Sequence, residues 1–176
     1  MPSQIGGRYF RLHWKRKRLY NRTCFKEVTL FKPWKITIMV KIVVLSEYST
    51  SPPSELGTGR IKIDVGPIYD LSRVQALAQE ENQLQAWTEK CRKDVRKWFD
   101  DDWQRVSDLI GSLRNADYID SEWCENGKGA IVACDAYSYH LTETAPATGQ
   151  PLRMEYFVKF AVNKAGTLVL MVSCHA

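Results

Sequence analysis

A chain of 176 residues is long enough for one well-packed domain, and 44% hydrophobic with 26% charged residues is typical of a soluble globular protein. Five cysteines without a CxxC pair argue against a disulfide scaffold and predict a reducing, cytoplasmic compartment. The apolar stretch 36–45 is short and is interrupted by Lys41, and no secretory signal is visible, so neither export nor membrane insertion is expected.

The net charge of +5 is divided unevenly, with +9 on residues 1–38 and −4 on residues 39–176. We therefore predict a basic N-terminal tail, 1–38, and a single domain, 39–176. The basic run 15–18 has aromatic residues around it, a composition that suits single-stranded nucleic acid. A poorly ordered tail, or natural translation from Met39, are the alternative interpretations.

Strands are expected at 36–45 and 60–65, on either side of a Ser- and Pro-rich loop at 49–54. Three helices are expected to follow. The first begins at an N-cap on Asp70 or Ser72 and ends near Glu81, and the second runs from about 84 to 99. The third covers 103–113 after the three aspartates 100–102.

The second helix is the basic element of an otherwise acidic domain. Its apolar positions follow helical spacing and leave the basic residues free to contact a partner. The expected buried stripe is Trp87, Cys91, Val95 and Trp98, and the candidate RNA-binding residues are Lys93, Arg96 and Lys97.

The C-terminal half predicts strands. An edge strand is expected at 117–123 and a further strand at 130–139, followed by a polar loop at 142–152. A hairpin then joins an alternating strand, 153–162, to an apolar strand, 167–174, that is covered on both faces. Gly166 in the hairpin loop is expected to have a positive φ. The fold class is therefore α/β, of the α+β kind.

Four side chains on these strands are candidates to converge into a catalytic site. RNA cleavage by transfer to the 2′-hydroxyl needs a base, a cation for the phosphate and an acid for the leaving oxygen. The candidates are Asp135, Tyr137, Lys159 and His175. In the alternative interpretation Lys159 faces solvent, Tyr137 belongs to the core and His175 has no role.

No phosphate-binding glycine loop and no structural zinc spacing is present, so no cofactor or metal is expected. The one metal alternative is a site built from Cys134, Cys174 and His175.

Several short segments follow one another in an order that resembles the order found in one protein family. They are YDLSRVQAL (69–77), Thr88, VSDLIGSL (106–113), Asp117-Tyr118 with Ser121, DAY (135–137), YFVKF (156–160) and LMVS (170–173). In this order, residues 66–176 resemble the MqsR-type toxins, bacterial mRNA interferases with a RelE-like fold. The resemblance implies a small antiparallel sheet with about three helices, endoribonuclease activity on mRNA, and neutralisation by a protein antitoxin.

The chain departs from that family at four positions. Asp120 and His175 stand where the family has lysines, Cys134 stands for a glutamine, and Phe157 stands for a tyrosine. Two interpretations follow. Either the site is rebuilt around His175, Tyr137 and Lys159, or the scaffold survives as a non-catalytic binding protein.

Overall fold

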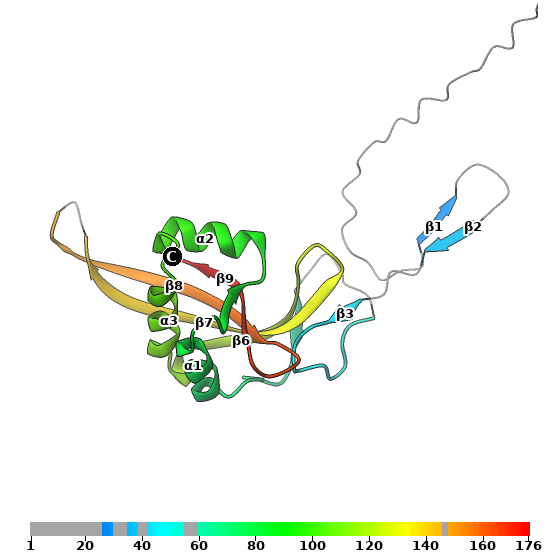
Figure 1. Cartoon of the computed structure of the whole chain (residues 1–176), viewed down its shortest axis with the longest axis horizontal. Coiled ribbons are helices and arrows are strands. Elements are labelled where there is room, and N and C mark those ends of the chain that lie inside the picture. Colours follow the sequence, from blue (N-terminus) through cyan, green and yellow to red (C-terminus); the bar gives the residue numbers. More distant parts are fainter. Residues whose placement is uncertain (1–25, 30–34, 39–41, 55–59, 146–147) are drawn as a thin grey trace, which may run out of the picture.

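The protein has the expected mixed α+β fold, in which a seven-stranded sheet packs with three helices (Figure 1). The computed structural model describes residues 26–29, 35–38, 42–54, 60–145 and 148–176. None of the helices in these ranges is long and apolar enough to cross a membrane.

The N-terminal strands are short. β1 (Lys26–Thr29) and β2 (Lys35–Ile38) form a two-stranded antiparallel sheet of their own inside the predicted basic tail, and the remainder of 1–38 lies outside the described residues. β3 (Val43–Val44) pairs in parallel with the main sheet. The strand expected at 36–45 is therefore two strands, with 39–41 outside the described residues.

Each helix begins at a side chain that accepts a hydrogen bond from the first turn. α1 (Leu71–Gln79) has Asp70 as its N-cap, as expected. α2 (Glu89–Phe99) begins after Thr88, and α3 (Trp103–Ser112) begins after Asp102.

The predicted start of the second helix at residue 84 is wrong. Leu84–Ala86 is strand β5, which pairs in parallel with the last strand of the sheet. The Thr88 hydroxyl explains the boundary, because it accepts from Cys91 N and also donates to Val172 O at 2.8 Å. This side chain caps α2 and ties its first turn to the sheet.

The main sheet has the order β4-β6-β7-β8-β9-β5. Its remaining strands are β4 (Ile61–Ile63), β6 (Tyr118–Glu125), β7 (Ala130–Thr144), β8 (Pro151–Val162) and β9 (Val169–His175).

Two predictions about these strands are wrong. The segment expected at the edge, 117–123, is interior, because β4 pairs with β6 on the side away from β7. Both ends of the expected loop at 142–152 are strand, because β7 and β8 stay paired out to Thr144 and Pro151. These ends form a two-stranded arm that projects beyond the helices in Figure 1. The polar composition that suggested a loop reflects the exposure of the arm.

The core lies between the three helices and one face of the sheet, which we call the helix face. Val158 and Phe160 of β8 are fully buried there. In α2 the buried positions are Cys91, Val95 and Phe99, four residues apart. Phe99 takes the buried position predicted for Trp98, and Trp98 is only half-buried. The Phe99 ring lies 5.6 Å from the Tyr156 ring.

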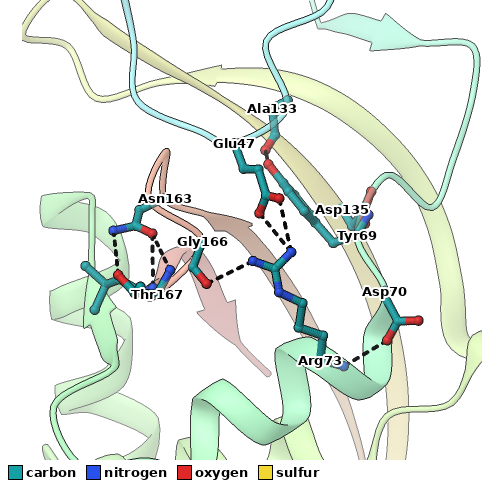
Figure 2. A network of polar contacts seen from close by, with 10 residues as sticks. Glu47, Tyr69, Asp70, Arg73, Ala133, Asp135, Asn163, Gly166 and Thr167 are labelled. Atoms are coloured by element: carbon teal, nitrogen blue, oxygen red, sulfur yellow. Dashed lines mark hydrogen bonds and ion pairs between the residues drawn. The ribbon is translucent and has the colours of Figure 1, made fainter.

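A polar network fixes the hairpin that leads into the last strand (Figure 2). Arg73 of α1 reaches Glu47 at 2.9 Å and donates to the carbonyl of Gly166 at 2.9 Å. Gly166 has φ +73°, as expected, and a Cβ there would lie 2.3 Å from the Arg73 guanidinium. Only glycine fits this position without displacing Arg73. The hairpin, and with it the start of β9, is held against α1.

Candidate functional site

The strand register separates the four candidate catalytic residues. Directly paired residues of antiparallel strands point to the same face. Asp135 is paired with Phe160, which faces the helices, whereas Lys159 is paired with Ala136 and Ser173 on the opposite face. The expected cluster of four is therefore not formed. Neighbouring strands do bring these residues close along the sheet, but successive side chains alternate between its two faces.

Asp135 is buried on the helix face and holds the segment before α1. Its carboxylate accepts hydrogen bonds from Ile68 N at 3.1 Å, Tyr69 N at 3.0 Å and Ser121 Oγ at 2.6 Å. Burial raises the pKa of this carboxyl above its ordinary value. Because all these partners are structural, Asp135 anchors the chain.

Tyr137 is a core residue. Its ring is fully buried, stacks on Phe160 at 5.4 Å and meets the Tyr118 ring edge-on at 5.7 Å. Burial raises the pKa of its phenol, and within the described ranges its hydroxyl has no hydrogen-bond partner. A substrate on the opposite face has no access to this hydroxyl.

Lys159 does not face solvent, because its side chain is only 8% exposed. Its ammonium forms a hydrogen-bonded ion pair with the carboxylate of Glu122 on β6. Because β7 lies between β6 and β8, the Lys159 side chain crosses over β7. Cys134 and Ala136 are the β7 residues opposite Glu122 and Lys159 on that face, and their small side chains leave room for the crossing. We call this surface the Lys159 face and define it by Glu122, Cys134, Ala136, Phe157, Lys159, Ser173 and His175.

Glu122 is the charged residue that the sequence analysis missed. It is 5% exposed and faces the basic strand β4 and its flank, where Arg60 Nε lies 3.5 Å from Oε2. Lys62 pairs with Asp120 at 2.8 Å beside it. The sequence signal for Glu122 was the alternation of two acids, Asp120 and Glu122, in one predicted strand and of two basic residues in the strand predicted at 60–65. Acidic and basic side chains therefore extend across this face of the sheet from β4 to β8.

His175 lies at the end of β9 and stacks on Phe157, with ring centroids 5.3 Å apart. The Lys159 ammonium lies 5.3 Å from the centroid of the same Phe157 ring. Burial, followed by the charge of Lys90, lowers the pKa of His175 below its ordinary 6.5. The imidazole is therefore mostly neutral at pH 7 and is half-exposed, so it can accept a proton.

Asp120, Cys134, Phe157 and His175, the four positions singled out in the sequence, also share this face. Asp120 is paired with Ala136, Cys134 with Glu122, and Phe157 with His175. Cys134 is fully buried, and burial raises the pKa of its thiol well above the ordinary range, so it is not a nucleophile.

The basic residues of α2 divide between two sides of the helix. Lys90 is bonded to Asp94 on the side toward His175. Helical spacing puts Lys93 three residues from both Lys90 and Arg96, and Lys97 on the same side of the helix as Lys90. Arg96 pairs with Asp101 at 3.0 Å, so within the predicted trio Arg96 is engaged locally.

The metal alternative is not assembled, because Cys134 and Cys174 lie on opposite faces of the sheet. The described part of the chain contains no group of three His, Cys, Asp or Glu residues that could hold a metal ion. Comparisons with protein families, with curated proteins and with solved structures find no match.

Proposed function

We propose that this protein is a toxin-like endoribonuclease that cleaves mRNA on the Lys159 face. The observation that carries the proposal is the joint placement of His175 and Lys159 against Phe157. A neutral imidazole and an ammonium on one aromatic platform provide a base and a cation within reach of one phosphodiester.

In the proposed reaction His175 accepts the proton of the 2′-hydroxyl. The 2′-oxygen then forms a bond to phosphorus while the bond from phosphorus to the 5′-oxygen breaks, which leaves a 2′,3′-cyclic phosphate. The leaving 5′-oxygen takes a proton from water. Lys90, Lys93 and Lys97 hold the flanking backbone. The resemblance to MqsR-type toxins adds a cytoplasmic setting and a protein antitoxin as partner.

The test is His175→Ala in the full chain, with cleavage of a defined mRNA and growth arrest on expression as readouts. The expected loss of rate is roughly 10²–10⁴-fold, with an unchanged melting temperature. His140 is a matched control, because it is an exposed histidine of the projecting arm. His140→Ala should cleave like the parent. Full activity of His175→Ala would contradict the proposal.

One observation favours a second candidate, a non-catalytic binding protein on the same scaffold. The Lys159 ammonium is already neutralised by Glu122 and is buried, so it offers a phosphate little free charge. A parent protein that binds RNA or an antitoxin but neither cleaves mRNA nor arrests growth would favour this alternative.

A further inference from the structure

The contact between Lys159 and Glu122 has the chemistry of an occupied anion site. Lys159 supplies the ammonium, and Arg60 and Lys62 approach the same carboxylates from β4. Three cations therefore surround the two carboxylates of β6, Asp120 and Glu122. A phosphate group presents the same kind of charged oxygen to lysine and arginine as a carboxylate does.

The carboxylate of Glu122 is incompletely satisfied. Its Oε1 accepts from Lys159, but its Oε2 is buried with no hydrogen-bond partner among the described residues, and Arg60 Nε, 3.5 Å away, contacts it only as an ion pair. A buried charged oxygen without a hydrogen bond is costly. A carboxylate released from the ammonium can gain the partners that Oε2 lacks, which offsets part of the free energy of breaking the pair.

We propose that the Lys159 face carries a phosphate-binding site centred on Lys159, which Glu122 occupies in the free protein. An RNA phosphate displaces the Glu122 carboxylate from the ammonium, and Arg60, which already contacts Oε2, holds the released carboxylate. The inference relies on the proposed function only for the source of the phosphate. Glu122 therefore sets how strongly the face binds its ligand.

The test compares Glu122→Gln with Glu155→Gln in the full chain. Glu155 is a matched control, because it is an exposed carboxylate on the same face of β8 and its replacement changes the net charge equally. The probes are inorganic phosphate and a non-cleavable 2′-deoxy oligonucleotide, titrated by following the Phe157 and His175 resonances.

Glu122→Gln should bind a probe roughly ten- to a hundredfold more tightly than Glu155→Gln. For the oligonucleotide, the slope of log K against log salt should steepen by about 0.7. The gain should vanish in Glu122→Gln/Lys159→Gln. Equal affinities of Glu122→Gln and Glu155→Gln, or a gain that survives loss of Lys159, would overturn the proposal.

If Glu122→Gln does not fold, Glu122→Asp takes its place, since it keeps the charge but shortens the reach by one methylene. It should show a smaller gain in affinity that Lys159→Gln again removes, and an affinity equal to that of the parent overturns the proposal.

A gain for the oligonucleotide alone supports the site with a nucleic-acid backbone as ligand, and a gain for inorganic phosphate alone supports it with free phosphate. Neither probe is cleaved, so the phosphate site can be refuted by the binding titrations while the proposed nuclease activity is tested separately by mRNA cleavage.

Discussion

The ammonium of Lys159 reaches across β7 to the carboxylate of Glu122, and both residues are more than nine-tenths buried. Two desolvated charges attract each other strongly, but most of that attraction only offsets the cost of removing them from water. The ion pair therefore adds little to the free energy of unfolding, but each charged side chain needs the other as its partner.

Replacing one residue of the ion pair should lower the free energy of unfolding far more than replacing both. Lys159→Met leaves the Glu122 carboxylate buried alone, and a loss of about 3–5 kcal/mol in the free energy of unfolding is expected. Lys159→Met/Glu122→Met should be close to the parent. Urea unfolding of the three proteins measures both values. A double variant as unstable as the single one would show that packing, and not charge, sets the cost.

The Tyr137 hydroxyl is buried without a hydrogen-bond partner among the described residues. Tyr137→Phe should therefore leave the free energy of unfolding unchanged or raise it by about 1 kcal/mol. Tyr69 is a matched control, because its buried hydroxyl donates to Ala133 O at 2.8 Å. Tyr69→Phe should cost about 1 kcal/mol. RNA cleavage unaffected by Tyr137→Phe would agree with the core role of this residue, and a large loss of rate would restore it as a catalytic candidate.

The effect of Asp135 on stability should depend on pH. Burial raises the pKa of Asp135 above 3.8 in the folded protein, so the folded state binds this proton more tightly than the unfolded chain. Its contribution is fully present below pH 3.8 and is lost as the pH rises through the raised pKa. The stability difference between the parent and Asp135→Asn should therefore shrink over that interval. Urea unfolding between roughly pH 3 and neutrality measures this difference, and a difference that grows with pH would contradict the prediction.

The sequence patterns predicted most of the elements because burial alternates clearly in them. The hairpin from β8 to β9 and the helices α1 and α3 follow directly from apolar spacing, caps and Gly166. β5 was missed because three residues are too few to show a period, and its pairing with β9 is a long-range contact. The polar arm was missed because composition reports exposure, while the ladder of β7 and β8 uses backbone groups.

The site was less predictable for a different reason. Asp135 and Lys159 were correctly placed on neighbouring strands, but the register decides which face each occupies, and register depends on the turns and on the pairing of whole strands. His175 and Lys159 do share a face with Phe157. Glu122 joins them only because small residues on β7 let Lys159 cross, which a single-strand pattern does not reveal.

The basic residues of α2 should bind RNA unequally. Lys97 lies on the same side of the helix as Lys90 and Lys93 lies one turn from Lys90, whereas Arg96 is paired with Asp101. Lys93→Gln/Lys97→Gln should weaken binding of a non-cleavable oligonucleotide and reduce its salt slope by roughly 1.4, or about 0.7 for each lost contact. Arg96→Gln should change the slope little. Equal effects of the two variants would indicate general attraction to a basic helix.

The pH profile of cleavage should identify the role of His175. As a base, the imidazole must be neutral, so the rate should fall as the pH drops through its pKa, and the midpoint should lie below 6.5 because burial and Lys90 lower that pKa. Lys159 acts in the same direction, whereas Asp94 raises the pKa. Lys90→Gln should therefore move the midpoint upward, and Asp94→Asn should move it downward.

Lys128 is a suitable control, because it lies in the exposed turn between β6 and β7. Lys128→Gln changes the net charge as Lys90→Gln does, and it should leave the midpoint in place. A profile in which the rate falls with rising pH would assign His175 as the acid that protonates the 5′-oxygen. A profile insensitive to both Lys90→Gln and Asp94→Asn would mean that the titrating group is not His175.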